Sequence, residues 1–242
     1  MTDGAALYVF GEVLFDEFPD GNRLLGGAPF NVAWHLQALG ESPRLVSRVG
    51  DDARGDQVRA AMADWGLDTG FLQTDPRRPT GRVAVTITDG EPAYNIVPDC
   101  AYDHIETVSL PPGGLLYHGS LAARADASAD TLRQLRAAGP RQVFIDVNLR
   151  PPWWRRAAVL QWLQGAHWVK LNSAELALLA DATPSQDTGR AFLRRHQLQD
   201  CSSRRERRVR NCCWPGAIAC RSRRCPASKL RTRLAPVMPL RQ

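Results

Sequence analysis

Cysteine is almost absent from the first 200 residues of this 242-residue chain, where Cys100 stands alone. That scarcity excludes a disulfide framework for this part and favours a reducing, cytoplasmic environment. No basic-then-apolar signal segment opens the chain, and no apolar run approaches the roughly 20 residues that a membrane helix needs. The composition therefore predicts a soluble cytoplasmic protein without a membrane partner.

Acidic residues and glycine are scarce in residues 201–242, which contain one of each, Glu206 and Gly216. The same segment holds twelve Lys or Arg residues and five of the six cysteines. The net charge of +6 is thus a property of the tail, because residues 1–200 carry more acids than bases. The charge of the whole chain does not by itself indicate a polyanion partner.

Apolar strands alternate with amphipathic helices along the first 199 residues. A β-type run covers residues 6–18, and the next segment, 29–40, predicts a helix with Val32, Leu36 and Leu39 on its buried face. Strand-like segments then alternate with helical ones, which indicates a parallel sheet covered by helices. In such sheets, sites lie at the carboxyl ends of the strands, and several polar residues and one glycine are predicted there: Asp16, Gly119, Asp146, Asn148 and Asn172.

Five segments occur in an order that resembles a known family: GEVLFDEFPDG, LGGAPFNVAWHLQALG, VSRVGDDARGD, DVNLRPPWW and KLNSAE. Together they resemble the ribokinase-like sugar kinases of the phosphofructokinase-B type, and among these the fructokinase-like branch. The resemblance covers residues 5–199. It implies an α/β fold with a ribokinase-like parallel-sheet core covered by helices and a small β lid, the sheet being incomplete at its C-terminal side.

The resemblance also implies a sugar site, built from Asp16, Gly26, Gly27, Asn31, Asp146, Asn148 and Arg150. Carboxylates accept hydroxyl hydrogens, and a carboxamide both donates and accepts, so these side chains suit a sugar. Glycines let the backbone approach a ligand closely. Arg150 would neutralise phosphate charge, with an ion pair to Asp146 as the alternative role for this residue.

Asn172 and Glu175 match the Asn-x-x-Glu motif of the same family. The resemblance implies that they help to organise Mg²⁺, through water, and the phosphate of ATP, with no direct metal ligand assigned. Their spacing is also that of a capping box at a helix start, and both roles are compatible. The five histidines show no ligand spacing, and nothing in the sequence gives Lys170 a role.

The expected domain spans residues 1–199, with lid strands from about 12–25 and 80–100, and a tail at 200–242 that we expect to be disordered. Residues 81–97 predict a hairpin that turns at Asp89-Gly90. The family lid closes over the sugar, excludes water and often forms a homodimer contact. A plain surface hairpin is the alternative.

One family motif is missing from the sequence. Kinases of this type carry Asp-Thr-x-Gly-Ala-Gly-Asp, whose backbone amides form an anion hole and whose last Asp is the general base. The printed sequence contains nothing like it. We therefore expect little or no kinase activity.

The tail fits a frameshift near Asp200. When the last base of each codon is read with the first two of the next, residues 211–215 must encode Leu-Leu-Leu-Ala. In the same frame, Arg231 through Pro239 allow Asp-Thr-Val-Gly-Ala-Gly-Asp-Ala, with the last Ala forced. The missing motif is thus consistent with the loss of one base.

Three functions remain open. The first is a sugar kinase by ancestry, using ATP and Mg²⁺, with fructose favoured over ribose, 2-keto-3-deoxygluconate and nucleosides. The second is a non-catalytic sugar-binding remnant. The third, zinc or nucleic-acid binding by the tail, is disfavoured because Cys212, Cys213, Cys220 and Cys225 lack paired Cys-x-x-Cys spacing and Trp214 is the tail's one aromatic residue. No specific nucleic-acid partner is expected.

Overall fold

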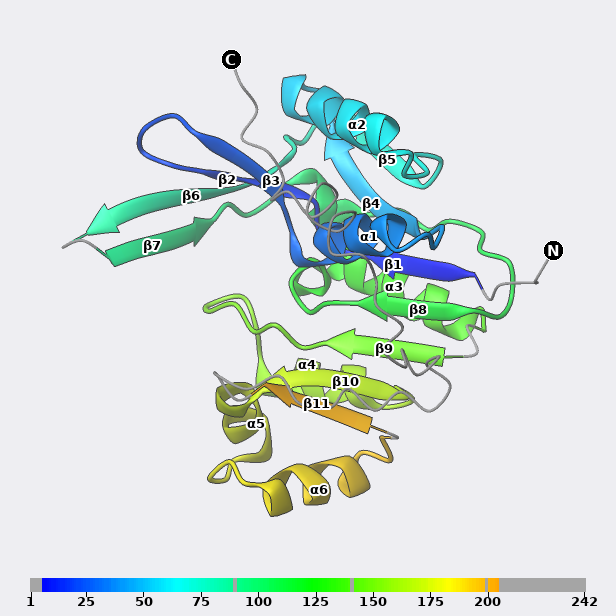
Figure 1. The fold of residues 1–242 in the computed structure, drawn as a ribbon, viewed down its shortest axis with the longest axis vertical. Coiled ribbons are helices and arrows are strands. Elements are labelled where there is room, and N and C mark those ends of the chain that lie inside the picture. The colour runs from blue at the N-terminus through cyan, green and yellow to red at the C-terminus, as the bar shows by residue number, and fades with distance from the viewer. Residues whose placement is uncertain (1–5, 89–90, 140–141, 199, 205–242) are drawn as a thin grey trace, which may run out of the picture.

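A seven-stranded sheet forms the centre of the molecule in the computed structural model, which describes residues 6–88, 91–139, 142–198 and 200–204 (Figure 1). The strand order is β11-β10-β9-β8-β1-β4-β5, and every neighbouring pair is parallel. The strands are β1 (Leu7–Phe10), β4 (Arg44–Gly50), β5 (Leu72–Asp75), β8 (Leu115–His118), β9 (Gln142–Asp146), β10 (Trp168–Asn172) and β11 (Asp200–Arg204). The predicted parallel sheet is confirmed.

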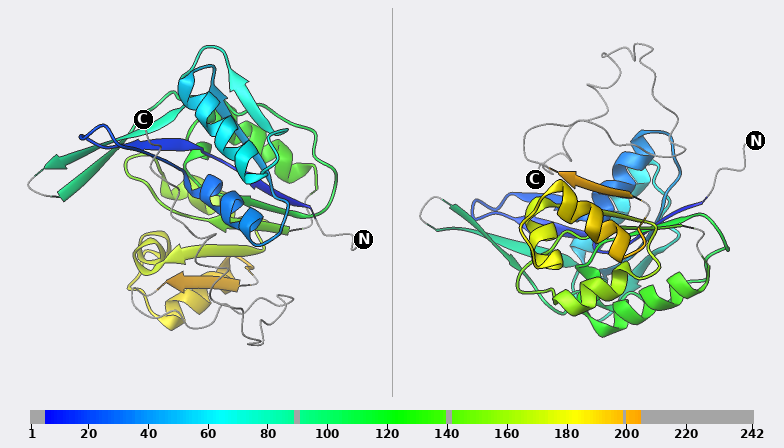
Figure 2. Two further views of the ribbon diagram at one scale, coloured as in Figure 1. Left: turned by 45° about the horizontal axis from the view of Figure 1, so that its top comes forward. Right: turned by 90° about the horizontal axis from the view of Figure 1, so that it is seen from below.

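Helices cover the two faces of this sheet in separate layers (Figure 2). On one face, Val9 and Leu45 pack with α1 (Ala28–Ala38) and α2 (Ala53–Trp65). Their strand neighbours Tyr8 and Val46 point to the other face and belong to a second apolar cluster. That cluster includes α3 (Asp126–Ala137), α4 (Arg156–Leu163), α5 (Ser173–Ala180) and α6 (Gln186–Arg195). Both faces are therefore apolar, as expected of a parallel sheet buried between helices.

A second, four-stranded sheet extends from the side of the core to which the arrowheads of β9 and β10 point (Figure 1). Its order is β3-β2-β6-β7, with β2 (Leu14–Glu17), β3 (Arg23–Gly26), β6 (Gly81–Thr88) and β7 (Glu91–Ile96). Strands β2, β6 and β7 lie within the ranges given for the expected lid, and β3 ends one residue beyond them, at Gly26. The single β-type run predicted at residues 6–18 is wrong, because the chain leaves the core sheet at Gly11 and joins the second sheet at Leu14.

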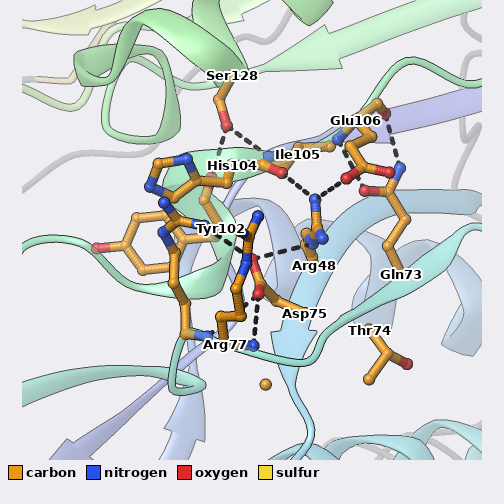
Figure 3. A network of polar contacts seen from close by, with 12 residues as sticks. Arg48, Gln73, Thr74, Asp75, Arg77, Tyr102, His104, Ile105, Glu106 and Ser128 are labelled. Carbon is orange, nitrogen blue, oxygen red and sulfur yellow. Dashed lines mark hydrogen bonds and ion pairs between the residues drawn. The ribbon is translucent and has the colours of Figure 1, made fainter.

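A partly buried ion network fixes the connection from β5 to β6, where the chain passes from the core to the second sheet (Figure 3). Arg48 Nε lies 3.3 Å from Asp75 Oδ2, and Arg48 Nη1 lies 2.6 Å from Glu106 Oε1. Asp75 Oδ1 accepts hydrogen bonds from the backbone N–H groups of Arg77 and Arg78. The root of the second sheet is thereby tied to a core strand.

Two further expectations differ from the structure. Val32 and Leu36 are partly buried against the apolar cluster that contains Phe30 and Ala33, as expected, whereas Leu39 is 77% exposed, so the predicted face of α1 is wrong at Leu39. The domain boundary expected at residue 199 lies before the last described strand, since β11 pairs in parallel with β10. The hairpin of β6 and β7 is present, and its Asp89-Gly90 turn lies outside the described residues. Within the described part of the chain, no helix has the length and apolarity to cross a membrane.

Candidate functional site

A cavity of about 720 Å³ lies between the carboxyl ends of the core strands and the second sheet. Its wall combines residues after β1, β8 and β9 with residues of β10, β2, β6, β7 and the first turn of α1: Glu12, Leu14, Asp16, Gly27, Ala28, Asn31, Val83, Tyr94, Ile96, Leu121, Asp146, Asn148, Arg150, Pro151 and Lys170. A site at this edge is expected for an open parallel sheet. The cavity is therefore the main candidate site in the described chain.

Six of the seven residues predicted for a sugar site line this cavity: Asp16, Gly27, Asn31, Asp146, Asn148 and Arg150. Gly26 ends strand β3 and is not among the lining residues. Asn172 and Glu175 also lie away from the cavity wall. The structure thus brings together side chains that are separated by more than 130 positions in the sequence.

The turn before α1 needs a glycine at residue 27. Gly27 has a φ of +107°, in the region that favours glycine, and a Cβ there would come within 2.6 Å of the Glu12 carbonyl oxygen. Gly27 therefore packs closely against the backbone of Glu12, in the segment that follows β1. This packing places the first turn of α1, which carries Asn31, at the cavity wall.

Two carboxyl groups in the cavity have raised pKa values. Burial raises the pKa of Asp16, and the positive charge of Arg150 opposes this. Burial raises the pKa of Glu12 to about 7, opposed by backbone N–H groups of Glu12 and Ala28 and by Arg150. Arg150 is thus electrostatically coupled to both carboxyl groups, although its own side chain is exposed.

Asp146 is held by a lysine and a tyrosine from the two neighbouring strands. Lys170 Nζ lies 2.7 Å from Asp146 Oδ1 and 2.6 Å from Oδ2, and the Tyr117 hydroxyl donates to Oδ2 at 3.1 Å. Burial raises the pKa of Tyr117 well above its usual range, so this phenol stays protonated. Asp146 forms its ion pair with Lys170. The alternative role given to Arg150, an ion pair with Asp146, is therefore absent from the described residues.

The chain after β9 turns sharply at Asn148, whose φ of +42° is tolerated by asparagine better than by most residues. The next backbone N–H, of Leu149, donates to Glu175 Oε1 at 2.9 Å. This bond anchors the turn on helix α5 and leaves Arg150 at the mouth of the cavity.

Asn172 and Glu175 form the predicted capping box of α5. Asn172 Oδ1 accepts from the Glu175 N–H, and Glu175 Oε2 accepts from the Asn172 N–H. Both carboxylate oxygens of the buried Glu175 are therefore engaged by backbone groups. They do not fit a direct Mg²⁺ ligand role, and no catalytic step is assigned to them.

Other candidate metal or ligand sites gain no support in the described residues. They contain no group of three or more His, Cys, Asp or Glu side chains arranged to hold a metal ion. A cavity of about 510 Å³ between residues 164–167 and 195–197 carries no carboxylate. The zinc alternative depends on Cys212, Cys213, Cys220 and Cys225, which lie outside the described residues.

Three polar residues of this site have no role that the sequence pattern predicts. Lys170 stands opposite Asp146 in the β9–β10 register, and an alternating lysine in an apolar strand was the available signal. Tyr117 faces the same carboxylate from β8. Glu12 looked like one more polar residue of a long strand, because the change of sheet at Gly11 was not visible in the pattern.

Comparisons with known proteins agree with this fold. The model of the pfkB family of carbohydrate kinases matches residues 10–198. The chain is 32% identical over 197 residues to a fructokinase of Escherichia coli, and 31% identical over 192 residues to one of Klebsiella pneumoniae. These alignments cover 74% and 72% of this chain but 64% and 62% of the relatives, so the chain spans less than two thirds of their length.

Solved structures share the fold. A fructokinase of Vibrio cholerae, crystallised with fructose, ADP and a calcium ion, matches with a TM-score of 0.72 at 23% identity, over 82% of this chain and 70% of that one. An aminoimidazole riboside kinase of Salmonella enterica matches with a TM-score of 0.69 at 26% identity, also over 82% and 70%. The cavity described above lies within the matched residues of the family model.

Proposed function

The chain belongs to the pfkB family of carbohydrate kinases, and on that premise we propose that it binds a sugar, fructose being favoured, in the cavity lined by Asp16, Asn31 and Asn148. The observation that carries the proposal is the convergence of these polar groups from β2, α1 and the turn after β9 on one cavity. Carboxylate and carboxamide groups together can pair with several hydroxyls of one ligand. Fructose is the named substrate class of the curated relatives.

Phosphoryl transfer by this chain is a separate matter. In the family, ATP with Mg²⁺ supplies the phosphoryl group, and transfer needs a general base and donors for the phosphate charge. The Asp-Thr-x-Gly-Ala-Gly-Asp motif is missing from the sequence. Both oxygens of Glu175 accept backbone hydrogen bonds, one from Asn172 in the helix cap and one from Leu149 in the turn after β9. We therefore propose that this chain binds a sugar but catalyses little or no phosphoryl transfer. This proposal favours a non-catalytic sugar-binding remnant over an active kinase.

The second sheet would act as the lid of this site. Val83, Tyr94 and Ile96 of β6 and β7 contribute apolar side chains to the wall of the cavity. Tyr94 is 61% exposed, so a ligand below it would bury more of the ring. Closure of this sheet would exclude water from the sugar, and a homodimer through its outer face is part of the same proposal.

Thermal unfolding of the purified chain with increasing fructose tests the binding proposal. A ligand that binds only the folded state raises the melting temperature with concentration. We expect a saturable rise with fructose, lost in Asp16→Asn and kept in the matched control Asp64→Asn on the exposed surface of α2. Glycerol at equal concentration controls for a solvent effect.

The outcomes separate binding from catalysis. Absence of any saturable sugar effect in the unsubstituted chain contradicts the proposal. ADP formation that depends on fructose would leave binding intact and contradict the assignment of little or no catalysis.

A further inference from the structure

Glu12 is a buried carboxyl group with an unsatisfied atom. Its side chain is 2% exposed, and its Oε2 atom has no hydrogen-bond partner among the described residues. Leaving a carboxyl oxygen buried and unpaired costs free energy, so most such groups in native proteins bind something. Glu12 therefore has capacity for one more partner.

The missing partner would come from the cavity, because Glu12 is one of the residues that line it. The charged and titratable groups that face Glu12 from the surrounding elements are Asp16, Tyr102, Tyr117, Asp146, Arg150 and Lys170. The carboxylate of Asp146 is engaged by Lys170 and Tyr117. None of these groups forms a hydrogen bond with Glu12 Oε2 in the described structure.

We propose that Glu12 is a sugar-contacting residue, whose Oε2 atom accepts a hydrogen bond from a hydroxyl group of the bound sugar. This inference rests on the proposed sugar-binding function and adds a second carboxyl group, next to Asp16, to the binding residues. A sugar hydroxyl is small, neutral and able to donate, which suits a single buried carboxyl oxygen without a partner.

The electrostatics of the cavity give this contact a pH signature. Burial raises the pKa of Glu12 to about 7, so the ionised and neutral forms are both populated near neutral pH. A donated hydroxyl compensates the lost hydration of the ionised form, which the charge of Arg150 favours and that of Asp146 opposes. Sugar binding should then release a proton from Glu12 and become tighter as the pH rises through about 7.

The competing explanation is that Glu12 has a purely structural role and supports the turn before α1. The backbone N–H of Ala28 stabilises the ionised Glu12, so the side chain could serve only to hold that turn. Such a role predicts lower stability on substitution, but it predicts no pH-dependent sugar affinity that disappears together with the carboxyl group.

Calorimetric titration with fructose at pH 6, 7 and 8 separates the two roles. For the unsubstituted chain we expect an affinity about tenfold tighter at pH 8 than at pH 6, since only the ionised fraction binds well. Glu12→Gln keeps the shape but cannot ionise, so its affinity should be independent of pH and roughly tenfold weaker at pH 8. Glu12→Leu should be at least as weak.

Asp75→Asn is the matched control. Asp75 is 1% exposed, and its Oδ2 has an ion pair with Arg48 but no hydrogen-bond partner. It lies in the network of Figure 3, outside the cavity. This variant should melt at a lower temperature and keep both the fructose affinity and its pH dependence.

Two results overturn the inference. One is a fructose affinity of the unsubstituted chain that does not change between pH 6 and pH 8. This measurement does not depend on the folding of any variant. The other is a Glu12→Gln protein that binds fructose as tightly as the unsubstituted chain at pH 8. Binding by the unsubstituted chain together with either result leaves the proposed function standing, whereas no fructose binding at any pH overturns both.

Discussion

Lys170 and Asp146 stand opposite each other on the adjacent strands β10 and β9, and the lysine ammonium reaches both carboxylate oxygens, at 2.7 and 2.6 Å. The Asp146 side chain is 9% exposed and that of Lys170 is 39% exposed. The pair therefore places a nearly buried negative charge and a partly hydrated positive charge on the cavity wall. Removing either partner leaves the other in a different electrostatic environment.

Lys170→Met should destabilise the fold because it removes the ammonium group paired with the nearly buried Asp146 and leaves the Tyr117 hydroxyl as the remaining described partner of that carboxyl group. Loss of one partner of a fully buried pair costs about 3–5 kcal/mol, and the partial exposure of Lys170 lowers our expectation to about 1–3 kcal/mol. Urea unfolding at pH 7 measures the change. Asp146→Asn in the Lys170→Met background should recover part of the loss, and an unchanged free energy of unfolding in Lys170→Met would contradict this account.

Gly27→Ala should damage both the fold and the sugar site, because a Cβ there meets the Glu12 carbonyl at 2.6 Å and the backbone holds a φ of +107°. We expect a loss of about 2 kcal/mol or more in the free energy of unfolding. Gly26→Ala is the neighbouring control, since the nearest atom to its Cβ would be Asp16 Oδ2 at 3.8 Å, an ordinary contact. Equal losses in the two variants would show that the turn before α1 is not restrictive.

Much of the core fold could be predicted from the sequence, because strands buried on both faces and amphipathic helices have distinct local patterns. The run at residues 6–18 was misread since apolar alternation continues across Gly11, although the chain there changes sheet. The predicted face of α1 is right for Val32 and Leu36 and wrong for Leu39, because Leu39 caps the end of the helix, beyond the contacts that bury Phe30 and Ala33. Local periodicity does not reveal where a helix meets its sheet.

The site was predictable where residues stand at strand ends, as for Asp16, Asp146 and Asn148, since parallel strands gather those ends at one edge. Lys170 and Glu12 were missed for a different reason. Their positions depend on the register of β10 with β9 and on the burial of the segment after β1, and both are properties of the three-dimensional packing.

Glu175→Ala should cost more stability than Asn172→Ala, although both belong to one capping box. Loss of a capping side chain alone costs about 1 kcal/mol. Glu175 also accepts the Leu149 N–H, so its removal leaves a second backbone donor unpaired and should raise the total to about 2–4 kcal/mol. Urea unfolding of the two variants measures the difference.

The Glu175 variant should bind fructose more weakly as well, because the turn that carries Asn148 and Arg150 loses its anchor on α5. Similar stability and similar sugar affinity in Glu175→Ala and Asn172→Ala would show that the bond to Leu149 contributes little.

Acid should destabilise the connection between the two sheets through Asp75. Burial raises its pKa, but hydrogen bonds from the backbone of Arg77 and Arg78 and the charge of Arg48 outweigh burial and hold the pKa of Asp75 below its usual value of 3.8. A carboxyl group whose pKa is lower in the folded state stabilises the protein above its unfolded-state pKa. That stabilisation is lost as the pH falls through the lower, folded-state pKa.

The melting temperature of the unsubstituted chain should therefore fall steeply below about pH 4, and that of Asp75→Asn should start lower and change less. Asp64→Asn, on the exposed surface of α2, should follow the unsubstituted profile. Parallel profiles for all three proteins between pH 6 and pH 2 would contradict a role for Asp75.

The tail after residue 200 is consistent with a shifted reading frame. One base restored near codon 200 should replace the Arg- and Cys-rich tail and encode the Asp-Thr-x-Gly-Ala-Gly-Asp motif where Arg231–Pro239 now stand. The restored chain should phosphorylate a sugar with ATP, because the motif supplies a general base and backbone donors for the phosphate charge. Alanine at the last Asp of that motif should lower the rate by about 10²–10⁴-fold. Sequencing the DNA gives the first answer, since a stop codon in the displaced frame would exclude the frameshift before any enzyme assay.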